Sequence, residues 1–197
     1  MKKPQLFGKA LLGIGVLSLS LATVSCKDSK PEDPKEVAED ANEAKFEKAE
    51  SAEDVAETLV DAAEFDLTQR ELGKLAQANG VSQEVKDLGK MMETHHNDSF
   101  NDLATLAETK TISVPNAITE DGQSEYDKLK KQDAKNFDKD YSNQILDDHK
   151  EAIDDFAKES QRVTDPEVKS YLERKVTSLT EHHKAVEALI AKLNLKK

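Results

Sequence analysis

The amino-acid sequence predicts an all-α protein whose four helices pack as an antiparallel up-down bundle. From about Ala52 onward, apolar residues recur at intervals of three and four, which is the spacing of one helix face. Gly and Pro become scarce over the same residues. Apolar and polar residues never alternate over a useful length, so no strands are expected. Short connections at 79–81 and 163–165 force neighbouring helices to run antiparallel.

Residues with known capping preferences mark the expected helix ends. The first helix stops before Asn79-Gly80, a favourable C-terminal signal, and Ser82 can cap the second. Thr164-Asp165-Pro166 ends the third helix and restarts the chain, with Asp165 as N-cap and Pro166 in the first helical position. The expected helices comprise residues 52–78, 82–109, 124–162 and 166–195.

The apolar stripes of these helices define the expected core. About 145 residues, 53–197, supply enough apolar side chains for one core and too few for two domains. The inward positions are Phe65, Leu72, Leu75 and Ala76; Val85, Leu88, Met92, Leu103 and Leu106; Leu129, Phe137, Tyr141, Ile145 and Phe156; and Leu172, Val176, Leu179, Val186, Ile190 and Leu193.

The N-terminus has the pattern of a bacterial lipoprotein signal peptide. Three lysines precede an apolar run, residues 10–25, that is too short to span a bilayer comfortably. The run ends at Cys26, the one cysteine, which resembles the lipidated cysteine of such proteins although Thr23 stands where Leu is usual. The alternative is an ordinary secretory signal followed by an incidental cysteine. We therefore expect residues 1–25 to be a signal peptide and Cys26 to carry lipid.

Charge and composition then indicate the location and exclude one class of partner. Residues 26–52 are mostly charged or alanine, and we expect an acidic tether that is helical after Pro34. Loss of residues 1–25 changes the net charge from −12 to −15, so we expect no nucleic-acid binding. The lipid would hold the protein in the cell envelope, at the outer membrane or its periplasmic side. Lys27-Asp28 also resembles an export signal to the cell surface.

The five histidines lie on the second, third and fourth expected helices and nowhere else. His96 and His149 fall on the apolar stripes of their helices, whereas His182 and His183 flank the stripe of theirs. All of these positions are near the middle of a helix. Antiparallel packing brings mid-helix positions to one level, so imidazoles from three helices are expected to meet.

Such a cluster is typical of a transition-metal site, because imidazole suits Zn, Cu and Ni. Glu93 lies three residues before His96, the i, i+3 pair of di-metal helical bundles. The expected ligands for one transition-metal ion are His96, His149 and His182, with Glu93, Asp148 and His183 as further candidates. The alternative is a buried hydrogen-bond network without metal, or one that protonates near pH 6.

Segments spread over the domain resemble the bacterial domain-of-unknown-function 4142 family. They are ELGKLA at 71–76, KMMETHHNDSFNDL with His96, NFDKDYSNQILDDHKEAIDDF with His149, and LTEHHKAVEAL with His182. The resemblance implies a ferritin-like bundle in a secreted or envelope-bound protein without an established biochemical role. The sequence departs from the family pattern at three positions, where Gln69 replaces a carboxylate, His95 an aspartate and Thr177 a proline. It also lacks the second E-x-x-H of a di-metal centre, because Leu146 stands where Glu would be needed.

These observations leave three classes of function open. The first is a lipid-anchored envelope module whose histidines hold a metal ion. The second is a structural or interaction module in which the histidines only complete a buried network, with a protein partner that the sequence does not identify. The third is a metal-dependent oxidoreductase, which Gln69 and Leu146 disfavour because a di-iron centre needs several bridging carboxylates.

Overall fold

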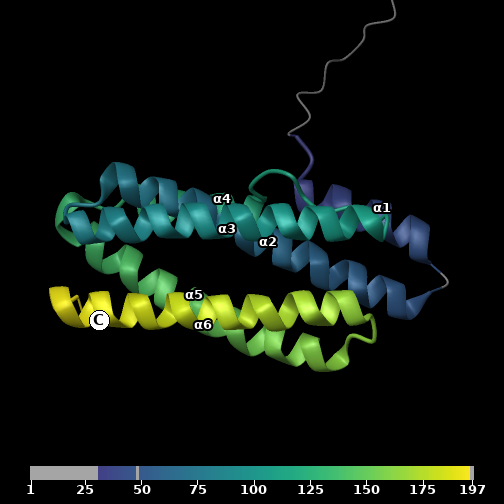
Figure 1. The fold of residues 1–197 in the computed structure, drawn as a ribbon. Coiled ribbons are helices and arrows are strands. Elements are labelled where there is room, and N and C mark those ends of the chain that lie inside the picture. Colours follow the sequence, from purple (N-terminus) through teal and green to yellow (C-terminus); the bar gives the residue numbers. More distant parts are fainter. Residues whose placement is uncertain (1–30, 48, 196–197) are drawn as a thin grey trace, which may run out of the picture. The chain divides into compact units, whose positions relative to one another are not determined.

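The structure is a computed structural model that describes residues 31–47 and 49–195. From Glu32 onward the chain forms one compact unit (Figure 1). Within the described residues there are six α-helices and no strand, which confirms the all-α prediction. The helices are α1 (Pro34–Phe46), α2 (Glu50–Asn79), α3 (Gln83–Thr109), α4 (Glu120–Lys130), α5 (Ala134–Arg162) and α6 (Pro166–Leu193).

Helices α2, α3 and α6 begin and end within a few residues of the predicted bounds. The side chain of Ser82 accepts a hydrogen bond from the Val85 N–H and caps α3. The Asp165 carboxylate accepts the N–H groups of Glu167 and Val168 at the start of α6, where Pro166 takes the first helical position. Local capping chemistry therefore sets these boundaries.

The prediction of one long helix over residues 124–162 is wrong. The chain forms two helices there, α4 and α5, separated at residues 131–133. Asp133 caps α5 by accepting the Asn136 N–H, and Thr119 caps α4 by accepting the Gly122 N–H. The Asp133 cap satisfies a backbone donor that a continuous helix would pair with its own carbonyl.

Part of the predicted tether is a helix that packs on the domain. Helix α1 follows Asp33, whose side chain accepts the Lys35 N–H, and it contacts α2. Its Ala38 and Asn42 are buried. The Asn42 amide donates to the Ser113 carbonyl and accepts the Ser113 N–H, both at 2.8 Å. The expected helix after Pro34 is present, and it is more than a spacer; the division of the chain at residue 52 stays a prediction.

The long helices pack mainly as two pairs, α2 with α3 and α5 with α6 (Figure 1). Contacts of α3 with α6 and of α2 with α5 join the pairs. The buried apolar side chains form two clusters, one that contains Leu59, Leu103 and Leu172, and another that contains Leu72, Met92 and Val186. Four buried polar residues fall between the two clusters, one on each long helix: Asp66 on α2, His96 on α3, His149 on α5 and His182 on α6.

Two glycines bring α2 and α3 unusually close together. A Cβ atom on Gly73 would lie 2.6 Å from the Gly89 carbonyl oxygen, and one on Gly89 would lie 2.6 Å from the Gly73 oxygen. No larger residue fits at either position without moving a helix. This crossing fixes the two helices about two turns away from Asp66 on α2 and His96 on α3.

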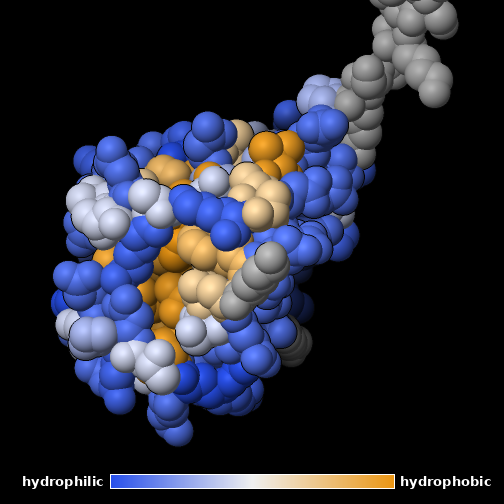
Figure 2. Space-filling model, turned by 90° about the vertical axis from the view of Figure 1, so that its right-hand side faces the viewer, coloured by the Kyte–Doolittle hydropathy of each residue, from blue (hydrophilic) through white to orange (hydrophobic). Residues whose placement is uncertain are grey.

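An apolar hollow opens at one end of the compact unit. Figure 2 faces the end where α3 stops and α5 turns into α6, and orange side chains are visible there among hydrophilic ones. A cavity of about 300 Å³ at this end is lined by apolar residues, Phe46, Ala52, Val55 and Ile112, and by polar ones, Ser51, Lys110, Thr164 and Asp165.

The remaining predictions for the N-terminus fall on residues that the structure does not describe. The predicted signal peptide, residues 1–25, and the predicted lipidation site, Cys26, lie outside the described residues. Across residues 31–47 and 49–195, no helix combines the length and the apolar character needed to cross a membrane.

Candidate metal centre

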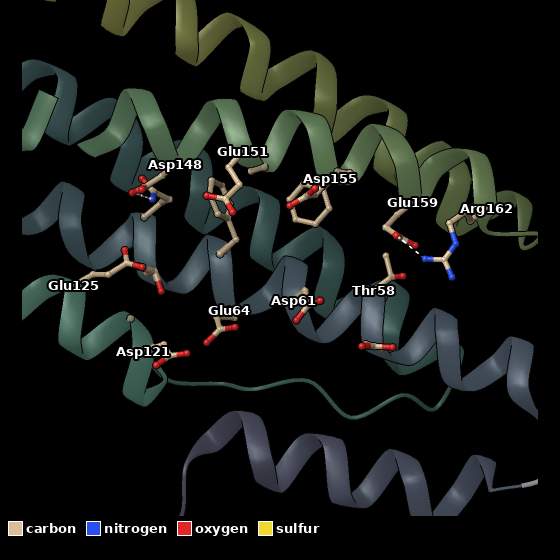
Figure 3. A pocket seen from close by; sticks show the side chains of 17 residues that line it. Thr58, Asp61, Glu64, Asp121, Glu125, Asp148, Glu151, Asp155, Glu159 and Arg162 are labelled. Carbon is tan, nitrogen blue, oxygen red and sulfur yellow. Dashed lines mark hydrogen bonds and ion pairs between the residues drawn. The ribbon is translucent and has the colours of Figure 1, made fainter. Parts of the chain in front are cut away.

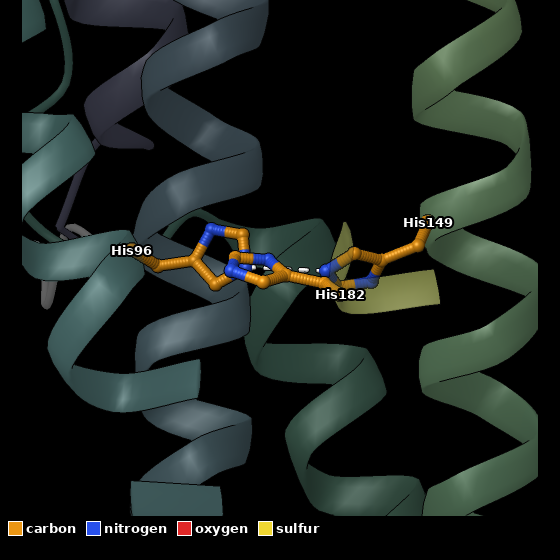
Figure 4. A group of neighbouring side chains, drawn as sticks. All are labelled: His96, His149 and His182. Carbon is orange, nitrogen blue, oxygen red and sulfur yellow. Dashed lines mark hydrogen bonds between the residues drawn. The ribbon is translucent and has the colours of Figure 1, made fainter. Parts of the chain in front are cut away.

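The structure brings together three of the histidines that the sequence singles out. His96 on α3, His149 on α5 and His182 on α6 each offer one ring nitrogen, and these nitrogens all lie within 4.8 Å of one another (Figure 4). The three rings are 1%, 0% and 4% exposed. Imidazoles from three helices therefore meet at one level, as the sequence predicted.

Hydrogen bonds fix the tautomers of two of the rings. His96 Nδ1 lies 2.8 Å from Asp66 Oδ1, and His149 Nδ1 lies 2.9 Å from the Ile145 carbonyl oxygen. Both partners are acceptors, so in each neutral ring Nδ1 carries the hydrogen and Nε2 carries a lone pair. The two Nε2 atoms face each other at 3.3 Å. Two lone pairs at this distance repel unless a cation lies between them.

The third ring is held by another histidine. His182 Nε2 lies 2.9 Å from His95 Nδ1, and the two rings are nearly parallel. His182 Nδ1 is buried and has no hydrogen-bond partner in the protein. If Nε2–H donates to His95, Nδ1 of His182 is left with a free lone pair. Each of the three rings is then oriented through one nitrogen while the other stays available.

A buried ion pair supports the histidines, and sequence reasoning missed it. Lys175 Nζ lies 2.7 Å from Asp66 Oδ1, the same oxygen that His96 contacts. Ser99 Oγ donates to the other carboxylate oxygen of Asp66 at 2.7 Å. We call these side chains and the three histidines the central polar layer: Asp66, His96, Ser99, His149, Lys175 and His182.

The sequence does contain a signal for this pair. Asp66 follows Leu59 by seven residues, and Lys175 lies three after Leu172 and four before Leu179. Both charged residues therefore fall on apolar stripes, where a charge is rarely found unless it is paired. One acid and one base on the inward faces of two helices are the pattern of a buried ion pair.

The surroundings keep the histidines neutral. Burial lowers the pKa of His96, although its bond to Asp66 opposes this. Burial and the neighbouring rings hold the pKa of His149 well below its usual value. Burial, His96 and His95 lower the pKa of His182 to about 3. The rings thus have unprotonated nitrogens near neutral pH, the form that binds metal.

Asp66 and Lys175 each oppose the effect of burial on the other's pKa. Burial would raise the pKa of Asp66, but Lys175 and the hydrogen bond from His96 bring it below its usual value. Burial lowers the pKa of Lys175. The Lys175 ammonium also lies 5.6 Å, 5.4 Å and 5.8 Å from the ring centres of Phe65, Phe156 and Tyr171. Aromatic faces attract a cation, so they add to the stabilisation by Asp66.

The other candidate ligands lie outside the group of three. Glu93 accepts a hydrogen bond from Gln77 at 2.7 Å, and His183 lies 3.6 Å from Glu187 on the same helix. Asp148 accepts a hydrogen bond from Gln69 at 3.0 Å, and burial together with Glu125 raises its pKa to about 7. The structure therefore does not bring Glu93, Asp148 or His183 to the position where the three imidazoles meet.

The three histidines could hold a single metal ion, since their ligand atoms lie within 4.8 Å of one another and one pair already has the required spacing. A tetrahedral ion with metal–nitrogen bonds of about 2.1 Å needs nitrogens about 3.4 Å apart, and the two Nε2 atoms are 3.3 Å apart. Metal-binding histidines characteristically donate their second N–H to a carboxylate, a carbonyl or another acceptor, as His96 and His149 do here. Three nitrogen donors suit Zn, Cu or Ni and leave one coordination position for another ligand.

The fold and the site define a class: an all-helical protein with a buried histidine cluster between two apolar clusters. Comparison with known families places the chain within that class. A model of the family described as "Domain of unknown function (DUF4142)" matches residues 39–189, and the chain belongs to this family. No curated protein and no solved structure gives a significant match.

Proposed function

We propose that this protein is a lipid-anchored module of the bacterial cell envelope that binds one transition-metal ion through His96, His149 and His182. In this proposal α2, α3, α5 and α6 form an antiparallel up-down bundle of the ferritin-like kind, and Cys26 carries the lipid. The protein then contacts the membrane through the lipid alone and does not bind nucleic acid. The role is binding rather than catalysis.

One observation supports the metal above all others. The Nε2 atoms of His96 and His149 face each other at 3.3 Å while both Nδ1 atoms are engaged with acceptors. The lowered pKa values of both rings argue against a shared proton at neutral pH. A metal ion turns this repulsive pair of lone pairs into two coordinate bonds.

Another observation favours the alternative, a structural module without metal. The positive charge of Lys175 contributes to the lowered pKa values of all three histidines, and Asp66 already offsets that charge. A divalent ion would add positive charge that no carboxylate in the central polar layer balances. On this alternative the histidines complete a buried network and the acidic surface meets a protein partner.

Metal content separates the two functions. We would purify the full chain in detergent, load it with Zn²⁺, Ni²⁺ or Cu²⁺, desalt it and measure bound metal by mass spectrometry. The proposal predicts roughly one ion per chain for one of these metals. His96→Ala and His149→Ala should each abolish stoichiometric binding.

His183→Ala is the matched control, because His183 neighbours His182 on α6 yet lies outside the group of three. It should bind as much metal as the unaltered chain. Binding that is substoichiometric, or equal in all four proteins, would favour the structural alternative. Circular dichroism spectra would verify that the variants keep their helices.

A further inference from the structure

A second concentration of functional groups lies on the surface between α2, α4 and α5. A cleft of about 500 Å³ is lined there by nine carboxyl groups and one guanidinium (Figure 3). We call it the acidic cleft; its charged residues are Glu57, Asp61, Glu64, Asp121, Glu125, Asp148, Glu151, Asp155, Glu159 and Arg162. It touches the central polar layer at Phe65, whose ring lies 5.5 Å from those of both His96 and His149.

The carboxylates stand in two rows along the cleft. Asp148, Glu151, Asp155 and Glu159 follow one another at three or four residues on one face of α5, and Glu57, Asp61 and Glu64 do the same on α2. Figure 3 shows the labelled members of the α5 row above those of the α2 row, with Asp121 and Glu125 on α4 at one end. At 1.5 Å per residue, successive carboxylates are spaced at about 4.5–6 Å along α5.

A buried amide adds an unused acceptor to this lining. Gln69 is 1% exposed and lines the cleft. Its Nε2 donates to Asp148, which leaves Oε1 buried without a hydrogen-bond partner in the protein. An unpaired buried acceptor costs free energy unless a donor reaches it. Carboxylates and this carbonyl make the cleft rich in acceptors, while Phe65 and Phe156 line it with aromatic rings.

The protein already places one ammonium group among these carboxylates. Lys35 Nζ, from α1, lies 2.8 Å from Asp61 Oδ1 and 2.7 Å from Glu64 Oε2. Burial opposes the charge of Lys35, but these two carboxylates raise its pKa above the usual value. Glu159 and Asp155 are paired with Arg162 and Lys158, respectively. The remaining carboxylates still leave the cleft strongly acidic, and burial together with Glu64 and Asp121 raises the pKa of Glu125.

The arrangement favours an elongated cation over a metal ion. In the described part of the chain, the three histidines are the one group of ligand side chains close enough to share a metal ion, and the cleft carboxylates form none. An aliphatic amine with three or four methylenes between nitrogens separates its charges by about 5–6 Å, given bonds of about 1.5 Å. This spacing matches the carboxylate row on α5. A cleft of this volume also suits a small molecule.

We propose that the acidic cleft binds linear aliphatic polyamines. The ammonium groups of the ligand would pair with the carboxylates of α2 and α5, one N–H donor would reach Gln69 Oε1, and the methylenes would lie against Phe65 and Phe156. This function is separate from metal binding by the histidines. The ligand recognised is a chain of protonated amines rather than a single charge.

Titration calorimetry with spermidine, putrescine and butylamine tests this. The full chain in detergent, at low salt and with EDTA present, should bind one spermidine, with affinity falling at least tenfold from spermidine to putrescine and again to butylamine. Glu151→Gln/Asp155→Asn should weaken spermidine binding at least tenfold. His96→Ala should leave it unchanged, which keeps this test independent of the metal proposal.

Glu173→Gln/Asp87→Asn is the matched control, because it removes the same charges from exposed positions outside the cleft. It should change affinity less than twofold. If both double variants weakened spermidine binding equally, the binding would depend on the overall surface charge and not on the cleft, and the proposal would be overturned. So would Mg²⁺ or Ca²⁺ displacing spermidine at lower concentration than spermidine itself requires, since the cleft would then be a divalent-ion site.

Lys35→Met provides a test of opposite sign. Removing the internal ammonium leaves Asp61 and Glu64 free to pair with the ligand. Spermidine affinity should therefore rise severalfold, provided that the helical circular dichroism spectrum is unchanged. Weaker binding in a folded Lys35→Met variant would contradict the assignment of these carboxylates to the ligand.

Discussion

The central polar layer and the acidic cleft both contact Phe65, yet they handle charge in opposite ways. In the layer, Asp66 is fully buried and is bonded to Lys175, His96 and Ser99. In the cleft, nine carboxyl groups that are exposed or half-buried lie near one another, and only some have a basic partner. A buried charge needs a partner within the protein, whereas a solvent-exposed charge is stabilised by water until a ligand binds. The central polar layer is therefore complete within the protein, and the acidic cleft has charges left to pair with a ligand.

Removing one charged partner should lower the free energy of unfolding far more in the central polar layer than in the acidic cleft. Lys175→Met leaves the Asp66 carboxylate buried without its ammonium partner, and we expect a loss of about 3–5 kcal/mol in the free energy of unfolding. Lys35→Met, at the partly exposed pair beside the cleft, should cost no more than about 1 kcal/mol. Urea unfolding measures both.

A double variant sharpens that experiment. Asp66→Asn/Lys175→Met removes both charges and should recover part of the stability lost in Lys175→Met. Equal losses for Lys175→Met and Lys35→Met would show that burial does not distinguish the two pairs.

The next largest effect on stability is expected at the close crossing of α2 and α3. Gly→Ala within a helix ordinarily stabilises by about 1 kcal/mol. In Gly89→Ala the new Cβ would lie 2.6 Å from the Gly73 oxygen and 2.7 Å from Ala76 Cβ. We therefore expect a destabilisation of about 1–3 kcal/mol, because the helices must separate. Thermal unfolding checks the sign, and a stabilised variant would show that the helices can move apart at no cost.

In the metal-free protein, the two regions should contribute with opposite sign to the pH dependence of the free energy of unfolding. The pKa of His182 is about 3 in the folded protein, so below about pH 6.5 the unfolded chain binds a proton that the folded chain does not. Stability should fall by about 2 kcal/mol from pH 7 to pH 5 through His182. The raised pKa values of Asp148, at about 7, and of Glu125 in the cleft have the opposite effect, because the folded state then binds their protons more readily.

Two variants separate these contributions in unfolding curves recorded with EDTA. His182→Gln should raise the stability at pH 5 relative to that at pH 7, because it removes the His182 contribution. Glu125→Gln should lower it, because it removes a contribution that grows on acidification. A profile unchanged by His182→Gln would contradict a neutral buried His182.

The smallest effect is expected from removing charge in the cleft. Without ligand, Glu151→Gln/Asp155→Asn relieves repulsion between like charges and should stabilise the protein by about 0.5 kcal/mol at low salt. The gain should vanish at about 1 M salt, where screening acts over about 3 Å. Destabilisation at both salt concentrations would indicate that these carboxylates support the fold.

The sequence predicted much of the fold because helix periodicity and caps are local properties. Ser82 and Asp165 cap helices as expected, and Met92, Ile145 and Leu179 are buried as expected. The break at Asp133 was missed because the pattern of apolar residues continues across it, from Leu129 to Phe137. Helix α1 was interpreted as part of a tether because its residues are mostly charged or alanine. Its buried residues, Ala38 and Asn42, lie only one turn apart and give no apolar pattern.

The sequence likewise identified which histidines would meet, but not how they are held. Periodicity placed His96, His149 and His182 on inward faces, and equal depth in their helices placed them at one level. It did not separate them from His183, which neighbours His182 in the chain but has turned away toward Glu187. His182 and His183 lie about 100° apart on α6, one on each edge of the apolar stripe, so periodicity alone gives no preference between them.

The sequence by itself determined the helical class, the membership in its family and the choice of inward-facing histidines, because each depends on spacing along one helix. Only the tertiary structure decided the tautomers of those rings, the pairing of Asp66 with Lys175 and the convergence of acidic rows from α2 and α5. These features depend on distances between helices. Such distances follow from packing, including the contact of Gly73 with Gly89, and no pattern within a single helix contains them.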